Sequence, residues 1–247
     1  MVKPSGTDDG AQGPTLAEVG GERPQSDAAR AAFIRAWTAA LPPPLVPELV
    51  VYTAQEATDL WQATEDELHA AGLPPPFWAF PWAGGQAVAR WLLDHPEQVR
   101  GRAVLDFGAG GGLAALAALR AGAARAVAAD IDAFAATAQR LNAALNGLPL
   151  ETVDRDIIGT PAGTGALAGI DLVVAGDVCY EAGMSGQVLT WLRGLAATGL
   201  PVLLGDPGRT FAPADGVEEL ASYQVPTPLA LEDRTMRTTL VWRLLAA

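Results

Sequence analysis

The sequence uses very little lysine, and Lys3 is the only one among its 247 residues. With 16 Lys and Arg residues against 28 Asp and Glu residues, the formal net charge is −12, and no run of basic residues occurs. Proteins that bind nucleic acid usually carry basic patches that neutralise phosphates. We therefore predict no nucleic-acid partner. The acidity is typical of a soluble enzyme, or of a surface that steers a basic protein segment, and composition does not separate the two.

Cysteine, histidine and long apolar runs are also scarce. Cys179 is the single cysteine, which excludes an internal disulfide, and the two histidines, His69 and His95, exclude a Cys/His metal cluster. No stretch approaches the ~18 apolar residues of a membrane span. The N-terminus has no apolar signal core, and its Asp8 and Asp9 argue against an acid-poor transit peptide. We expect a cytoplasmic, reduced protein with no metal and no membrane partner.

Composition divides the chain into three parts. Residues 1–26 combine Gly, Pro, Ser and charged residues with almost no large apolar side chain, which predicts a disordered acidic tail. Residues 27–100 form an expected N-terminal extension that packs on the core, and residues 101–247 form the main domain. Within the extension we expect helices at 27–37, 58–71 and 83–93, a strand at 45–52, and a stiff aromatic segment at 74–82.

From Gly101 onward, short apolar strands alternate with helices. The expected strands lie at 103–106, 126–130, 152–157, 172–175 and 201–205, and the last two segments, 223–225 and 236–244, form a terminal pair. The helix at 133–146 carries Phe134, Ala138, Leu141 and Leu145 on one face. Alternation of this kind implies a parallel sheet with right-handed crossovers. The predicted class is α/β, with a Rossmann-like seven-stranded sheet and a C-terminal antiparallel hairpin.

The strand that ends near Asp106 runs into a glycine-rich turn, residues 106–112. Dinucleotide-binding folds also use such a turn, but their G-x-G-x-x-G fingerprint needs glycine where Leu113 stands, and they prefer an apolar residue in place of Asp106. A buried carboxylate requires a cationic or N–H partner, which the ammonium group of S-adenosylmethionine and the turn amides can supply. The glycines that let the backbone approach such a ligand are Gly108, Gly110 and Gly112.

Two further acids follow neighbouring strands. Asp130 ends the second strand, where a carboxylate can accept hydrogen bonds from both ribose hydroxyls, and Asp132 beside it suits a helix N-cap. Asp156 is expected to end the third strand, where it can accept from the adenine amino group. Any one of these acids alone fits a loop or a cap equally well. Three at the ends of consecutive parallel strands predict a cofactor site for S-adenosylmethionine.

These residues carry a family resemblance. The turn at 106–112, Asp130 and the segment 177–180 (Asp-Val-Cys-Tyr) resemble the seven-strand, or class I, S-adenosylmethionine-dependent methyltransferases, in particular the lysine methyltransferases with a D-x-x-[YF] motif. From about residue 45 to Trp242, the chain is similar to the lysine methyltransferases of the electron-transfer flavoprotein β subunit. The segments that carry this closer similarity are 46–49, 78–86, 130–132, 176–180 and 205–209. Cys179 and the acidic tail depart from the family pattern.

The resemblance implies transfer of a sulfonium methyl group to a lysine ε-amine of that subunit. The amine must be neutral, which costs roughly 4–5 kcal/mol at pH 7 for a free lysine with a pKa of ~10.4. Burial lowers an amine pKa, whereas a carboxylate contact favours the charged form. We therefore assign Asp177 to positioning and proton acceptance, and Tyr180 to a cation–π wall of the acceptor channel.

The resemblance also assigns residues around the channel. Trp82 and Gly84, with Gly85, are expected to close over the cofactor, and Asp206 and Arg209 to contact the substrate protein. Each of these residues has a plainer structural interpretation. Asp177 suits a helix cap, Tyr180 suits core packing, Trp82 suits a staple that pins the extension to the sheet, and residues 206–209 suit a surface β-turn.

Other functions remain open at this point. A small-molecule N-methyltransferase can use the same fold and cofactor, because these do not fix the acceptor. A scaffold that binds S-adenosylmethionine without turnover is a second alternative. An NAD-linked oxidoreductase is disfavoured by Asp106 and Leu113.

Overall fold

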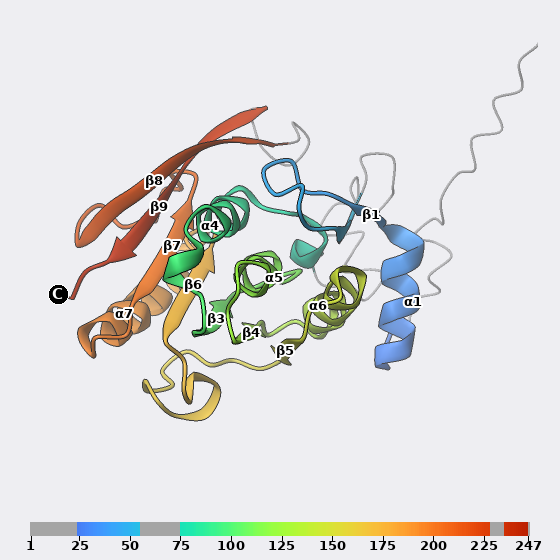
Figure 1. Ribbon diagram of the computed structural model, residues 1–247, viewed down its shortest axis with the longest axis horizontal. Helices are drawn as coiled ribbons and strands as arrows, with labels where there is room; N and C mark the ends of the chain where they lie inside the picture. The colour runs from blue at the N-terminus through green and yellow to red at the C-terminus, as the bar shows by residue number, and fades with distance from the viewer. Residues whose placement is uncertain (1–23, 55–74, 228–234, 247) are drawn as a thin grey trace, which may run out of the picture.

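The computed structural model describes residues 24–54, 75–227 and 235–246. Seven strands form one sheet in the order β5-β4-β3-β6-β7-β9-β8 (Figure 1). The first five in this order are parallel, whereas β9 runs antiparallel to both β7 and β8. The strands are β3 (Ala103–Phe107), β4 (Arg125–Ala129), β5 (Leu150–Val153), β6 (Leu172–Gly176), β7 (Val202–Asp206), β8 (Val217–Pro226) and β9 (Met236–Leu244). The predicted α/β class and seven-stranded sheet are confirmed.

Helices cover the two faces of the sheet unequally. On one face lie α4 (Ala83–Asp94), α5 (Leu113–Arg120) and α6 (Ala133–Asn146), and on the other lies α7 (Ala182–Ala197) (Figure 1). Neighbouring strand residues point to opposite faces, so Val104 packs with α4 while Leu105 packs in the cluster that contains α7.

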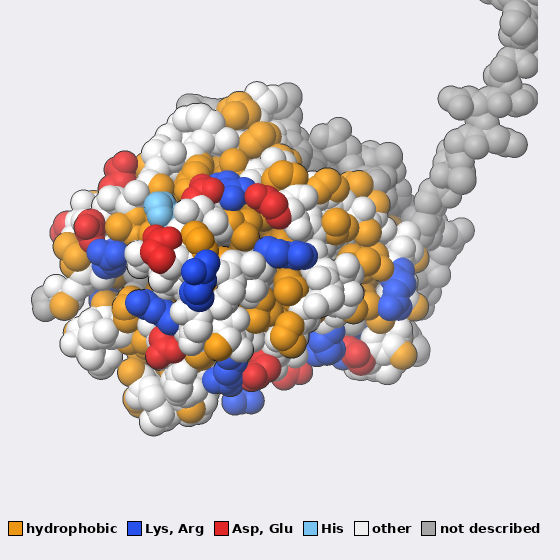
Figure 2. Space-filling model, viewed as in Figure 1, with side chains coloured by type: hydrophobic (Ala, Val, Ile, Leu, Met, Phe, Trp, Pro, Cys, Tyr) orange, Lys and Arg blue, Asp and Glu red, His pale blue; other side chains and the backbone are white. Residues whose placement is uncertain are grey.

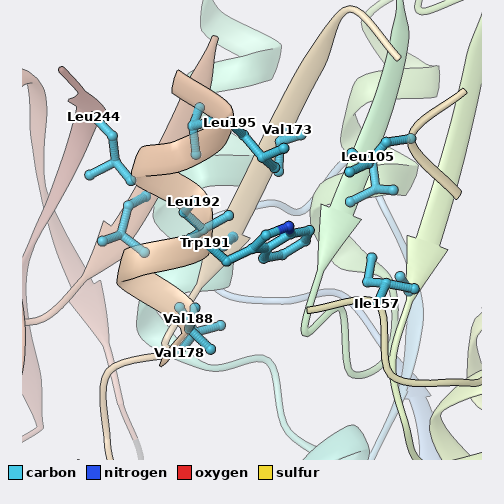
Figure 3. Packing of buried hydrophobic residues seen from close by; sticks show 14 of the residues in the cluster. Leu105, Ile157, Val173, Val178, Val188, Trp191, Leu192, Leu195 and Leu244 are labelled. Atoms are coloured by element: carbon cyan, nitrogen blue, oxygen red, sulfur yellow. The ribbon is translucent and has the colours of Figure 1, made fainter. Parts of the chain in front are cut away.

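The face with the single helix is completed by an irregular segment. Ile157, Leu167 of η4 (Gly165–Leu167) and Ile170 join the same cluster as Leu192 of α7. The indole N–H of Trp191 donates to the carbonyl of Thr160 over 2.9 Å. Figure 3 shows Trp191 pointing from α7 towards Leu105 and Ile157. Residues 157–170 therefore cover the face that α7 leaves open.

The described residues before α4 pack against α6. Helix α1 (Asp27–Trp37) begins at Ser26, whose side chain caps the first turn, and its Phe33 contacts Phe134 of α6 edge to face at 5.5 Å. Trp78, in the short helix η2 (Phe77–Ala79), stacks on the same ring at 5.9 Å. The antiparallel pair β1 (Ala39–Leu41) and β2 (Val51–Thr53) lies beside them. This packing brings the aromatic segment to the carboxyl edge of the sheet.

Several predicted boundaries are wrong. The strand expected at 45–52 is reduced to β2, because the preceding residues form turns that Val46 and Leu49 anchor by burial. Strand β5 ends at Val153, before Asp156, since its pairing with β4 stops there. Leu145 is 43% exposed, because the buried stripe of α6 runs instead through small and polar residues, Ala135, Gln139 and Asn142. Strand β8 begins at Val217, well before the expected 223.

Two predictions fall on parts of the chain that are not described. The helix expected at 58–71 and nearly all of the expected tail at 1–26 lie outside the described residues. Among the helices that are described, none combines the length and the apolar character required to cross a membrane.

Candidate active site

An open cleft lies at the carboxyl ends of β3 and β6. This edge of an open α/β sheet is where ligands bind. One wall is the glycine turn at 108–111, and the other is formed by the aromatic segment at 78–82. Asp106 and Asp177 both line the cleft, and we call the surroundings of Asp106 the cofactor end and those of Asp177 the acceptor end.

Asp106 is a buried carboxylate at the floor of the cofactor end. Its Oδ2 accepts a hydrogen bond from the N–H of Ala115, in the first turn of α5, over 3.0 Å. Burial raises the pKa of Asp106 to about 7, and the negative charge of Asp130 adds to this shift, although the hydrogen bond from Ala115 opposes it. A cationic ligand group would therefore stabilise the ionised carboxylate strongly. The ammonium group of S-adenosylmethionine fits this requirement.

The glycine turn is held open by side chains behind it. Gly110 and Gly112 adopt left-handed φ angles of 49° and 82°, which favour glycine. The carboxylate of Asp130 accepts from the N–H of Gly110 over 2.9 Å, while Gln139 and Asn142 of α6 donate to the carbonyls of Gly110 and Gly111. The turn therefore has a fixed conformation in which Gly108, Gly110 and Gly111 line the cleft, as a closely approaching ligand requires.

Asp130 and Asp156 differ in their surroundings. Asp130 follows β4 directly, is largely buried and accepts from two backbone N–H groups, those of Gly110 and Asp132. Asp156 is exposed in a turn, and its carboxylate accepts from the N–H of Ile158 over 2.9 Å. Neither Asp130 nor Asp156 lines the cleft. The expectation that Asp156 ends the third strand is wrong, because β5 ends at Val153, whereas its contact with adenine stays a prediction.

Asp177 marks the acceptor end of the cleft and is fixed on two sides. Its φ of 57° makes it the only non-glycine residue with positive φ in the described part of the chain, a strain that concentrates at functional sites. Its Oδ2 accepts from the N–H of Gly85, in the first turn of α4, over 3.0 Å, and its Oδ1 accepts from Arg209 over 2.9 Å. Burial raises the pKa of Asp177, although Arg209 opposes this shift. It caps no helix, because α7 begins after Glu181.

The first turn of α4 meets the sheet through glycines. A Cβ added to Gly84 would lie 2.3 Å from the carbonyl oxygen of Gly205 and 2.6 Å from Oδ2 of Asp177. Only a residue without a side chain lets α4 approach this closely, and the approach brings the Gly85 N–H to Asp177. Gly85 lines the cleft, whereas Gly84 does not. Close packing accounts for the glycine at position 84, and the role at the cofactor that we expected for it stays a prediction.

Aromatic rings form a rim beside Asp177. The indole N–H of Trp82 donates to the carbonyl of Phe77 over 2.9 Å, and the Phe77 ring contacts Tyr180 at 5.6 Å. Tyr180 is 48% exposed and Phe77 is equally so, which excludes plain core packing for Tyr180. Trp82 lines the cleft, and the guanidinium of Arg209 lies 5.9 Å from its ring centre. These rings make a surface that can enclose a long aliphatic side chain.

Comparison with known proteins identifies the family. Residues 90–176 match a family model described as Ribosomal protein L11 methyltransferase (PrmA). The chain is 38% identical over 216 residues to the Electron transfer flavoprotein beta subunit lysine methyltransferase of Xenopus laevis, covering 85% of each protein. This chain belongs to the family of the electron transfer flavoprotein beta subunit lysine methyltransferases. Its relative of the same name from Rattus norvegicus is 37% identical over 193 residues, which cover 76% of this chain and 70% of that protein. The methyltransferase resemblance predicted from the sequence is thereby confirmed.

Solved structures are more distant. A ribosomal protein L11 methylase from Lactobacillus delbrueckii subsp. bulgaricus has a TM-score of 0.46 at 19% identity, covering 66% of this chain and 78% of that one.

In this methyltransferase, Asp206 has a different position from the one expected. Its side chain is fully buried at the end of β7, and its Oδ1 accepts from the N–H groups of Gly208 and Arg209, both over 2.7 Å. Burial raises its pKa to about 6, and the charge of Asp177 contributes. Because no part of Asp206 reaches the surface, the expected contact with a substrate protein is corrected to a structural role in the turn at 206–209.

Two residues on α6, Gln139 and Asn142, were missed by the sequence analysis. Asn142 lines the cleft, donates to Gly111 and accepts from the N–H of Tyr52 over 2.8 Å. It therefore couples the N-terminal segment to the glycine turn. Polar residues at helical spacing on an otherwise apolar face, Gln139, Asn142 and Asn146, were the available signal. Cys179 is completely buried, which raises the pKa of its thiol to about 12.

Proposed function

We propose that this protein is an S-adenosylmethionine-dependent protein-lysine N-methyltransferase that acts on the electron transfer flavoprotein beta subunit. The names of its relatives support the substrate, and they match over most of the chain. The structural observation that carries the proposal is the position of Asp177. It lines the cleft together with Trp82 of the aromatic rim, and it is held by Gly85 and Arg209 rather than by the first turn of α5 that holds Asp106. One cleft thus has two buried carboxylates with different partners, one suited to a cationic cofactor group and one to an amine.

The described residues fit S-adenosylmethionine. Asp106 would hold its ammonium group, the glycine turn would lie against it, and Asp130 would accept from its ribose hydroxyls. Trp82 would close the cleft on the side of the aromatic segment. When bound, the cofactor supplies a methyl group on a sulfonium, which is already activated for transfer. The protein has mainly to place and to desolvate the acceptor.

The acceptor end is suited to a lysine side chain. The rings of Phe77, Trp82 and Tyr180 can surround its methylenes and exclude water from its amine, which lowers the amine pKa. The Asp177 carboxylate can accept a hydrogen bond from the amine and orient its lone pair towards the cleft. The proton released as the new N–C bond forms can pass to Asp177, whose pKa burial already raises.

Mass spectrometry of the purified beta subunit, after incubation with enzyme and S-adenosylmethionine, tests the proposal. We expect a mass gain in multiples of one methyl group, located on lysine by peptide mapping, and no gain with Asp177→Asn. No gain with the wild-type enzyme would defeat the substrate assignment. With labelled cofactor and a cell lysate, label found only in low-molecular-weight products would favour a small-molecule N-methyltransferase instead.

We also propose a cytoplasmic location and a function without nucleic acid. Lys3 is the only lysine, and the net charge of −12 disfavours binding to phosphates. On the face seen in Figure 2, arginine and acidic side chains are interspersed rather than gathered in one basic patch. Arg90, for example, pairs with both Glu48 and Asp94. Gel-shift titrations with RNA and DNA at low salt, and cell fractionation, test these two points.

A further inference from the structure

Arg209 points inward, towards the acceptor end of the cleft. The Asp206 carboxylate accepts from the N–H groups of Gly208 and Arg209 and so shapes the turn that follows β7. This turn returns the Arg209 side chain to the edge of the sheet. There its Nη2 donates to Oδ1 of Asp177 over 2.9 Å, and its guanidinium lies 5.9 Å from the Trp82 ring centre. A buried carboxylate thus holds the turn that presents the arginine.

The pair between Asp177 and Arg209 addresses a conflict in the chemistry. A carboxylate beside a lysine amine stabilises the ammonium form, which cannot accept a methyl group. A fixed positive charge within about 4–6 Å has the opposite effect and lowers an amine pKa by roughly 1–3 units. At Asp177, Arg209 and the N–H of Gly85 already compensate the negative charge. The carboxylate can then accept a hydrogen bond without favouring protonation.

We propose that Arg209 keeps the acceptor amine neutral, by neutralising Asp177 and by placing a permanent positive charge beside the amine. This inference rests on the proposed function, because it assumes an amine acceptor at Asp177. Arg209 acts through Asp177 and is a positioning residue. Arginine suits the role because its guanidinium stays charged at any pH that the enzyme meets and stacks on aromatic rings.

Among the described residues, the other titratable groups that interact with the pair or its neighbours are acids or weak acids. The segment at 75–82 and the first turn of α4 contain no titratable side chain. The groups that interact electrostatically with Asp177, Arg209 or their neighbours are Asp206 from β7, Asp130 from the end of β4, and Cys179, Tyr180 and Glu181 from the loop after β6. Any of them that ionises would favour the ammonium form. Among the groups named here, Arg209 alone is a cation.

The pH dependence of kcat tests the inference, with the beta subunit as acceptor at saturating cofactor. We expect Arg209→Gln to move the acidic limb of the profile up by about 1–2 pH units, because the acceptor ammonium then loses its proton less readily. Activity near pH 7.5 should fall roughly 10–100-fold and recover at alkaline pH, with KM unchanged or lower. Arg209→Lys keeps a cation, so its limb should stay within about half a unit of wild type.

Two controls separate this role from a structural one. Arg193→Gln removes an exposed pair with Asp215 and should leave the profile unchanged. The double variant Asp177→Asn/Arg209→Gln also lacks the carboxylate that stabilises the ammonium. The acidic limb of its pH profile should therefore return towards wild type, although its kcat should stay low. Calorimetric binding of S-adenosylmethionine verifies that each variant folds.

The possible outcomes decide different points. The inference about Arg209 is overturned if the acidic limb of Arg209→Gln does not move, or if this variant loses activity equally at every pH. Neither result would overturn the proposed function. If Arg209→Gln does not bind the cofactor, the pH profile of Arg209→Lys tests the inference instead. An acidic limb raised by a full pH unit in Arg209→Lys would then overturn the inference. A wild-type enzyme that methylates no lysine of the beta subunit would overturn the proposed function, and the inference with it.

Discussion

The two ends of the cleft are held by different kinds of interaction. At the cofactor end, backbone N–H groups and amide side chains fix the turn, as when Asp106 accepts from Ala115 and Asn142 donates to Gly111. At the acceptor end, an ion pair fixes Asp177 to Arg209, whose guanidinium lies 5.9 Å from the ring centre of Trp82. The first end comes largely from one stretch of sequence. The second is assembled from three distant segments, so it depends more on the packing of the whole fold.

Gly84 packs α4 against the sheet at the acceptor end, and its replacement should have the largest effect. In Gly84→Ala the new Cβ meets the backbone carbonyl of Gly205 at 2.3 Å, which cannot move aside as a flexible side chain would. We expect a loss of about 3 kcal/mol in the free energy of unfolding and almost complete loss of activity. Chemical denaturation and methylation assays measure the two effects.

Gly85→Ala is the matched control for Gly84→Ala. A Cβ at Gly85 meets no atom within 4 Å, and its N–H can still donate to Asp177. The free energy of unfolding of Gly85→Ala should stay within about 1 kcal/mol of the wild-type value, since alanine favours helix. Equal destabilisation of the two variants would contradict the close contact between α4 and the sheet.

Asp177→Asn should impair the acceptor end of the cleft and leave the cofactor end intact. Asparagine tolerates the left-handed φ of 57° as well as aspartate does, so the turn should persist. Without the carboxylate, the amine loses its orienting acceptor and proton acceptor, and we expect kcat to fall about 100-fold or more. Binding of S-adenosylmethionine, measured by calorimetry, should change less than about threefold. A parallel loss of cofactor affinity would show that the ends are not independent.

The sequence predicts the cofactor end better than the acceptor end. The glycine turn and Asp106 are close in sequence, and a strand followed by a helix places them by local geometry alone. The position of Asp156 could not be predicted, because the end of β5 depends on where its pairing with β4 stops. The inward direction of Arg209 depends on Asp206, which is buried only once β7 has paired on both sides. Contacts of this kind are set by tertiary packing.

The affinity for S-adenosylmethionine should depend on the protonation of Asp106. Burial raises the pKa of this carboxyl from its ordinary 3.8 to about 7, so in the free protein it is largely protonated below pH 7. The same shift means that the free protein loses stability as the pH rises from about 4 to 7. A bound ammonium favours the ionised form, so cofactor affinity should rise roughly tenfold between pH 5.5 and 7 and then level off.

Calorimetry across this pH range measures the effect, with Asp106→Asn as the control. The variant cannot ionise, so its weaker affinity should vary little with pH over the same range, and its stability should fall less steeply between pH 4 and 7, because only the contribution of Asp106 is removed. A rise in affinity that is equally steep in Asp106→Asn would assign the pH dependence to another group.

The smallest effect is expected at Asp156, and it distinguishes two acids that the sequence treats alike. Asp130→Ala removes the acceptor of the Gly110 N–H at the glycine turn, so cofactor affinity should fall about tenfold. Asp156→Ala removes only the acceptor of the Ile158 N–H in an exposed turn, and affinity should change less than about twofold. If both variants weaken binding equally, the loop after β5 must close over the cofactor when it binds, and Asp156 would regain the adenine contact that its place in this structure argues against.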